Sequence, residues 1–214
     1  MTFIDPVAAG AGGGSCDFEE KRGKPRFALL LRSAKLVGRN GEYLCIVRDV
    51  SEQGAKLRLF HPLGDEQHFS LEIATGERFA VDVIWEKEHE AGFRFLDPID
   101  VLRFVAEAGP FPKRPVRLKV SHEATIHVAG QQVPAIVHDL SRQGARIETD
   151  GKLAIGQKLR IDAKELPDFE ATVCWRRAPS YGLVFNRLMS LDELANRAFR
   201  MQQDLVPVAQ LRTA

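Results

Sequence analysis

A six-residue sequence that occurs twice carries the polar side chains best suited to binding chemistry. The first copy, DVSEQG, begins at Asp49, and the second, DLSRQG, begins at Asp139, 90 residues later. A carboxylate accepts hydrogen bonds from paired N–H donors, and a hydroxyl donates or accepts them. Asp and Ser also cap turns, and Gly takes left-handed conformations, so a single copy would indicate only a turn. We call each copy a hexad, and its repetition indicates one module used twice.

A basic segment precedes the first expected strand of each module. In the first module, Arg22 and Arg26 are four residues apart. A guanidinium presents five donors in a rigid fork, so an arginine pair can clamp a phosphate or the O6/N7 edge of guanine and can stack on its face. Taken alone, such a segment is equally consistent with a solvated linker.

The first hexad supplies groups that complement those arginines. The Asp49 carboxylate can accept hydrogen bonds from guanine N1–H and N2–H, Ser51 adds a hydroxyl, and Gly54 lets the backbone approach a ligand closely. Donors for phosphate together with an acceptor for guanine predict a guanine nucleotide site.

The second module departs from this pattern in its basic segment. When Arg117 is aligned with Arg26, Lys113 takes the position of Arg22, and Arg114 lies one residue beyond that position. Lysine can pair with a phosphate, but it cannot form a forked hydrogen bond or stack as arginine does. The second hexad keeps its polar positions, which are Asp139, Ser141 and Gly144. We therefore expect the first module to carry most of the affinity.

Other residues repeat with the same offset as the hexads. They are Trp85 with Trp175, Gly92 with Gly182, and Phe95 with Phe185. A repeat of this length indicates an internal duplication. Each module contains short β-rich runs separated by turns, without βαβ alternation, which predicts a small antiparallel barrel. The expected fold class is therefore mainly all-β, with two tandem six-stranded antiparallel β-barrels, each followed by a short α-helix.

The first helix is expected to start at Pro98, with Asp97 as its N-cap, and the second to start near Ser190, with Glu193 completing a capping box. The apolar face of the second helix is assigned to core packing. The expected division of the chain is a flexible tail at 1–20, a first domain at 21–108, a linker at 109–112, a second domain at 113–205 and a tail at 206–214.

Composition narrows the function. The chain is 44% hydrophobic with a net charge of +1, has no apolar run long enough to span a membrane, and begins without a secretory leader. Its three cysteines lack metal or redox spacing, so a cytoplasmic location is expected. The histidines are scattered and no Walker-type loop occurs, so neither an enzyme, a metal site nor a cofactor is expected.

The chain resembles the PilZ family over about residues 21–107 and 113–200. The resemblance rests on the order of four features: R-x-x-x-R, D-x-S-x-x-G, a strand ending in Trp, and a G-x-x-F strand. The resemblance implies a bacterial cytoplasmic receptor for cyclic di-GMP, without catalytic activity. It implies ligand binding by Arg22, Arg26, Asp49, Ser51 and Gly54. A possible second site comprises Lys113, Arg114, Arg117, Asp139, Ser141 and Gly144.

Two functions follow from this resemblance. The leading hypothesis is a cyclic di-GMP-binding regulator that changes its surface or interdomain arrangement and acts on a downstream protein partner. The alternative is a degenerate PilZ protein–protein interaction adaptor that binds no nucleotide. A third reading, a barrel that binds single-stranded nucleic acid, is disfavoured because the aromatic residues fall mostly at apolar strand positions.

Overall fold

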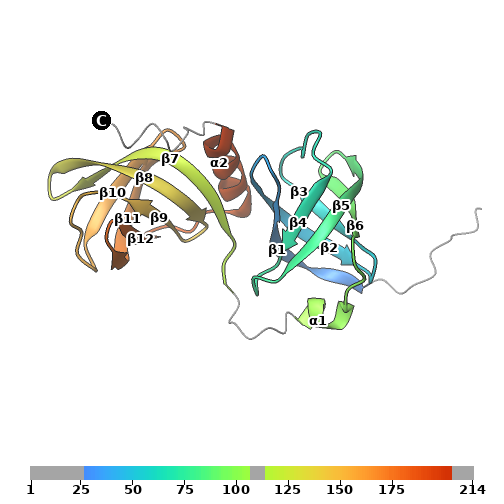
Figure 1. Cartoon of the computed structure of the whole chain (residues 1–214). Coiled ribbons are helices and arrows are strands. Elements are labelled where there is room, and N and C mark those ends of the chain that lie inside the picture. The colour runs from blue at the N-terminus through green and yellow to red at the C-terminus, as the bar shows by residue number, and fades with distance from the viewer. Residues whose placement is uncertain (1–26, 107–113, 204–214) are drawn as a thin grey trace, which may run out of the picture.

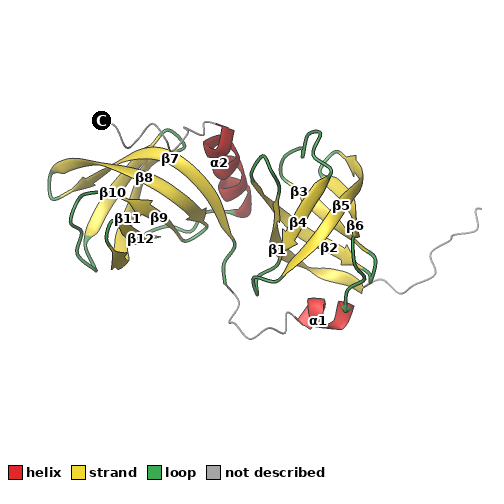
Figure 2. Cartoon of the chain, viewed as in Figure 1, coloured by secondary structure: helices red, strands yellow, loops and turns green. Residues whose placement is uncertain are grey.

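The computed structural model describes residues 27–106 and 114–203, and these fold into two closed β-barrels with a helix after each (Figures 1 and 2). Barrel 1 consists of β1 (Phe27–Val37), β2 (Glu42–Val50), β3 (Gly54–Leu59), β4 (His68–Glu72), β5 (Arg78–Lys87) and β6 (Glu90–Phe95), followed by α1 (Val101–Ala106). Barrel 2 consists of β7 (Arg117–Val128), β8 (Gln131–Ser141), β9 (Gly144–Glu148), β10 (Lys158–Ala163), β11 (Leu166–Arg177) and β12 (Ser180–Phe185), followed by α2 (Leu191–Gln203). The predicted fold class is confirmed.

The two barrels share one strand order and nearly one register. The neighbours run β1-β2-β3-β6-β5-β4 in barrel 1 and β7-β8-β9-β12-β11-β10 in barrel 2, and every pair is antiparallel. Phe27 pairs with Val50 as Leu118 pairs with Leu140, so the residue before Phe27 in the sequence, Arg26, corresponds to Arg117. This register supports the alignment of the two basic segments made from the sequence.

Alternation of apolar and polar residues places the core inside each barrel. In β3 the side chains of Ala55, Leu57 and Leu59 are buried while the residues between them are partly exposed. A period of two is what a strand with one buried face requires. Each barrel has a buried cluster of its own, but Leu44 on β2 belongs to the cluster of barrel 2. The two cores therefore meet at β2.

Helix α1 begins later than the sequence predicted. Asp100, rather than Asp97, is its cap, because the Asp100 carboxylate accepts from the Arg103 N–H at 3.1 Å. The assignment of Pro98 to the first helical position was wrong, since Ile99 N–H is instead bonded to the Glu52 carbonyl of the hexad at 2.9 Å. That bond holds the chain in a non-helical path against the first hexad.

Helix α2 has the predicted capping box. The Ser190 hydroxyl accepts from Glu193 N–H, and the Glu193 carboxylate accepts from Ser190 N–H, both at 3.0 Å. The helix lies between the two barrels (Figure 1). Leu194 and Ala198 are buried in the core of barrel 2, as predicted, whereas Phe199 contacts rings of barrel 1. One helix therefore closes one barrel and contacts the other.

Polar contacts fix the two barrels to each other. Gln202 of α2 binds both backbone groups of Glu42, accepting from its N–H at 2.6 Å and donating to its carbonyl at 2.9 Å. The Glu42 carboxylate accepts from Lys119 N–H at 2.8 Å and from Lys35 Nζ at 3.0 Å, and Lys35 also donates to the Arg117 carbonyl at 3.1 Å. Lys35 and Glu42 are buried charged residues, so their mutual pairing is required in this interface.

His61 is a titratable residue at this interface. Its ring stacks on Phe199, with the centroids 4.1 Å apart and the planes 10° apart. Burial lowers the pKa of His61; a hydrogen bond to the Ala195 backbone partly opposes the shift, and the charge of Arg200 adds to it. The neutral ring is thus favoured while the barrels are docked. Once they separate or unfold, the pKa of His61 returns to about 6.5 and the group binds more protons below that pH.

We therefore expect contact between the barrels to weaken as the pH falls below about 6.5. Thermal unfolding of the full chain at pH 7.5 and pH 5.5 measures this. His61→Phe keeps a ring against Phe199 but cannot take up a proton, so it should lose less stability between the two pH values. An equal loss in both proteins would contradict the assignment to His61.

Candidate functional site

The first hexad connects the end of β2 to the start of β3, and its own side chains close the turn. Ser51 N–H donates to the Gly54 carbonyl at 2.8 Å, while the Ser51 hydroxyl lies 3.2 Å from both the Gly54 carbonyl and the Gly54 N–H. Asp49 is not part of this turn. It lies in β2, paired with Ala28 of β1 and Lys56 of β3. Its carboxylate therefore remains available for other contacts.

The hexad glycines are required for a reason other than the expected left-handed conformation. Neither Gly54 nor Gly144 is among the described residues with positive φ, so the left-handed role was wrong. A Cβ on Gly54 would lie 2.5 Å from the Phe93 carbonyl oxygen, and one on Gly144 would lie 1.8 Å from that of Leu183. These glycines are required because the neighbouring strand passes too close for a side chain.

A pocket of about 230 Å³ lies beside the first hexad on the outside of barrel 1. Strand β2 contributes Asp49, strand β3 contributes Gly54, and the turn between them contributes Ser51, which places three of the predicted ligand residues together. Strands β5 and β6 contribute an apolar wall that includes Ile84 and Trp85. The pocket thus combines a carboxylate and a hydroxyl with exposed apolar surface.

Trp85 was not assigned to the site from the sequence, although its repetition with Gly92 was the signal that could have identified it. Its side chain is 43% exposed, and a Cβ on Gly92 would lie 2.1 Å from the indole Nε1. The glycine therefore allows the indole to lie directly against the backbone of β6. A ring held in that way beside a hydrogen-bonding carboxylate is suited to stacking on a planar base.

Lys56 lies in the same pocket, and its charge is directed to Glu90. Lys56 Nζ is 2.7 Å from Glu90 Oε2, and both side chains are more than one third exposed. Within the described residues, no side chain or backbone group is hydrogen-bonded or ion-paired to the Asp49 carboxylate. With respect to residues 27–106 and 114–203, the first hexad thus presents an open carboxylate.

The second hexad has the same turn but a closed carboxylate. Arg117 Nη1 is 2.6 Å from Asp139 Oδ1, and Arg146 Nε is 2.8 Å from Asp139 Oδ2. The Ser141 hydroxyl donates to the Gly144 carbonyl at 3.1 Å, and Ser141 is fully buried. The structure therefore places Ser141 and Gly144 in the support of the turn and joins Asp139 to Arg117.

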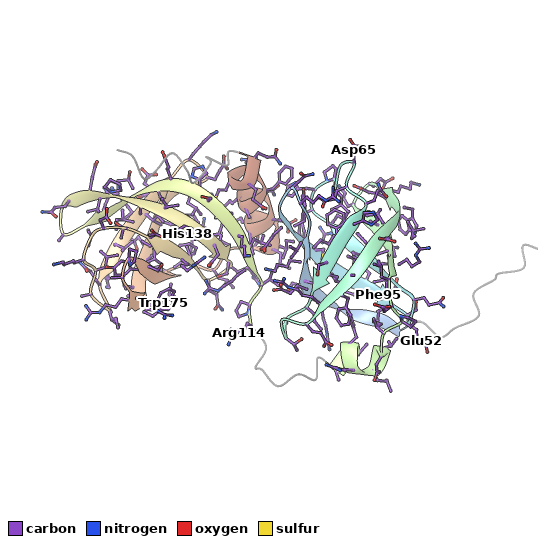
Figure 3. All side chains as sticks on the ribbon, viewed as in Figure 1. Glu52, Asp65, Phe95, Arg114, His138 and Trp175 are labelled. Carbon is purple, nitrogen blue, oxygen red and sulfur yellow. The ribbon has the colours of Figure 1, made fainter. Side chains whose placement is uncertain are left out.

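The other predicted site residues fall into two groups. Arg114 lies at the junction of the barrels (Figure 3), where its N–H donates to the Ala74 carbonyl at 3.1 Å, and it lines a pocket of about 420 Å³ with Lys35 and Glu72. It is separate from the Asp139 ion pairs. Arg22, Arg26 and Lys113 lie outside the residues that the structure describes.

The fold and the hexads define a tandem β-barrel protein with a pocket at the repeated motif. The family model described as PilZ domain matches residues 20–106 and 113–199. The chain therefore belongs to the PilZ family, with two copies of the domain. No curated protein matches the chain.

Several solved structures share the general likeness at low identity. The Borreliella burgdorferi PlzA protein in complex with c-di-GMP is 14% identical, with 83% of this chain and 94% of that chain covered at a TM-score of 0.35. The Bacillus subtilis inhibitor of motility MotI/DgrA is 14% identical, with coverages of 84% and 100% and a TM-score of 0.34. Escherichia coli YcgR in complex with c-di-GMP is 13% identical, with coverages of 81% and 82% and a TM-score of 0.29. Family membership rests on the domain match.

None of the helices in the described part of the chain is long and apolar enough to cross a membrane. Across residues 27–106 and 114–203, no group of three or more His, Cys, Asp or Glu side chains is placed to hold a metal ion.

Proposed function

We propose that this protein is a cyclic di-GMP-binding regulator and that barrel 1 carries its nucleotide site. The observation that supports the proposal is the pocket in which the open Asp49 carboxylate and the exposed indole of Trp85 lie together. In the sequence, Arg22 and Arg26 directly precede β1, whose first residue pairs beside the hexad. Family membership supports the same ligand.

Each group has a role that its chemistry suits. The Asp49 carboxylate accepts hydrogen bonds from guanine N1–H and N2–H, which only guanine among the common purines presents together. The Trp85 indole stacks on the base, and Arg22 and Arg26 bind the phosphates or stack on the second face. Ser51 and Gly54 hold the turn that positions Asp49, and the Ser51 hydroxyl lines the pocket.

Strands β1 and β2 offer a route from this site to a regulatory output. Strand β1 begins beside the hexad at Phe27, and strand β2 ends in it at Val50. Lys35 lies near the opposite end of β1 and Glu42 at the opposite end of β2, both at the interface between the barrels. We propose that ligand binding alters this interface and so changes the surface presented to a protein partner. The charge pair at the far end is the element through which the change would be transmitted.

Calorimetric titration of the full chain with cyclic di-GMP tests the function, with cyclic di-AMP as the control. Adenine lacks the N1–H and N2–H donors that Asp49 would accept. We expect binding of the guanine nucleotide and none of the adenine nucleotide under the same conditions. If neither nucleotide binds, the proposal is refuted and the adaptor that binds no nucleotide is favoured.

Replacing Trp85 with alanine is expected to weaken cyclic di-GMP binding by about 1–3 kcal/mol, the typical cost of losing a stacked base. Trp175→Ala in barrel 2 is the matched control. Trp175 is also exposed and also lies against a glycine, Gly182, but beside a closed hexad. Calorimetry on both variants should therefore show a loss only for Trp85→Ala. Equal losses would mean that the Trp85 wall is not specific to the site.

A further inference from the structure

Each hexad aspartate faces a cationic residue across the sheet. Asp49 of β2 pairs with Lys56 of β3, and Asp139 of β8 pairs with Arg146 of β9. Residues directly opposite in antiparallel strands have Cβ atoms about 4.5–5.5 Å apart. The backbone of both barrels therefore allows the cation to neutralise the carboxylate, and another residue must decide whether it does.

The cations themselves differ, Lys56 against Arg146, and a second difference lies on the third strand of this face. In barrel 1, Glu90 of β6 pairs with Arg58, two residues from Lys56, and its carboxylate binds Lys56 Nζ at 2.7 Å. In barrel 2 the equivalent residue is Ser180, which pairs with Glu148 on the same pattern. A serine hydroxyl carries no charge and cannot replace a carboxylate as the partner of a cation.

The two cations have correspondingly different partners. Arg146 is directed to Asp139, and with Arg117 it occupies both carboxylate oxygens, at 2.8 and 2.6 Å. The Asp139 side chain is only 14% exposed, and the two arginines that bind it are 49% and 41% exposed. A guanine base would have to displace them before it could bind Asp139.

We propose that Glu90 is a positioning residue of the first site, acting through Lys56, and that Ser180 leaves the second site closed. Glu90 holds Lys56 away from Asp49, so that the Asp49 carboxylate can accept the hydrogen bonds of the base. Without a carboxylate at position 180, Arg146 remains on Asp139. The inference rests on the proposed function, and it explains why two modules with intact hexads would bind unequally.

Calorimetric titration of the full chain with cyclic di-GMP provides the test. Glu90→Ser releases Lys56 to Asp49 and is expected to weaken binding about fivefold, the effect of a half-exposed ion pair. Glu90→Ser combined with Lys56→Met should restore the original affinity, because no cation remains to occupy Asp49. A merely structural role for Glu90 would not be rescued in this way.

Glu88→Ser is the matched control, because it removes the same charge from the adjoining β5–β6 turn. Its affinity should stay unchanged. Binding that is unaffected by Glu90→Ser, or that stays weak in the double variant, would overturn the inference.

Crystal structures of Glu90→Ser and Ser180→Glu give a readout that needs no ligand. The first should show Lys56 paired with Asp49, and the second should show Arg146 turned from Asp139 to the introduced carboxylate. Unchanged partners in both would overturn the inference. Failure of the original protein to bind the nucleotide would refute the proposed function, and these structures would still decide the inference.

Discussion

Replacing both Arg22 and Arg26 with alanine is expected to weaken cyclic di-GMP binding by about 3 kcal/mol or more, which is over a hundredfold. Hydrogen bonds from a guanidinium to a phosphate are charge-assisted and contribute more than neutral ones. The pocket beside the hexad supplies a carboxylate and a hydroxyl, and its lining cation, Lys56, is paired with Glu90. In the proposed site, the phosphates would therefore depend on Arg22 and Arg26. Calorimetric titration of the full chain measures the loss.

The loss must be distinguished from a general effect of net charge. Arg78→Ala with Arg103→Ala removes the same two charges from another part of barrel 1, where they pair with Glu72 and Glu77 on the surface. Exposed pairs of this kind contribute little to stability. The control should bind nucleotide as the original protein does. Undiminished binding by the Arg22→Ala, Arg26→Ala protein would show that the basic segment is not part of the site.

The sequence was sufficient to predict the barrels because their determinants are local and occur twice. Alternation of buried and exposed residues, as in β3, and turns at positions such as Asn40–Gly41 and Ala129–Gly130 are visible without any long-range contact. The capping box of α2 is equally local. The start of α1 was missed because a bond from Ile99 to the distant hexad competes with helix formation.

The site was predicted in its composition but not in its electrostatics. The sequence shows that Asp49, Ser51 and Gly54 recur as a unit, and the structure brings all three to one pocket. The sequence does not show that the nearby carbonyl of Phe93 requires a glycine at position 54, because that contact joins strands far apart in the chain. The ion-pair partners of Lys56 and Arg146 likewise depend on the third strand. Only the folded sheet shows that position 90 or 180 lies beside it.

The contact between the barrels had no local signature. Gln202 and Glu42 are 160 residues apart, and glutamine on a helix gives no indication that it binds a backbone. Lys35 and Glu42 lie in strands whose pattern alone would place charged residues in solvent, yet both are buried against the second domain. From the sequence, a linker at 109–112 was expected between the domains, and no contact between them was predicted. The structure shows direct contacts that act independently of it.

Lys35→Met is expected to destabilise this interface by about 3–5 kcal/mol, the typical cost of leaving a buried charge without its partner. Lys35 Nζ lies 3.0 Å from Glu42 Oε2 and 3.3 Å from Glu72 Oε1, so one ammonium serves two carboxylates. Without it, the buried Glu42 carboxylate keeps, among the described residues, the Lys119 N–H as its one donor and lies near the like charge of Glu72. Separation of the barrels would expose the Glu42 carboxylate to solvent and so relieve the cost of its burial.

The two tryptophans make this measurable, because each barrel contains one. Urea unfolding followed by fluorescence in Trp85→Phe and Trp175→Phe backgrounds reports the barrels separately. With Lys35 present, docking should couple the two unfolding transitions, and Lys35→Met should lower both midpoints and separate them.

Lys56→Met is the control. The Lys56–Glu90 pair has a similar distance of 2.7 Å but is exposed, so its loss should cost less than about 1 kcal/mol. Adding Glu42→Gln to Lys35→Met should recover part of the loss, because a neutral amide can still accept from Lys119 N–H. Unchanged midpoints in Lys35→Met would show that the apolar contacts of Leu44 and Phe199, rather than the buried charges, hold the barrels together.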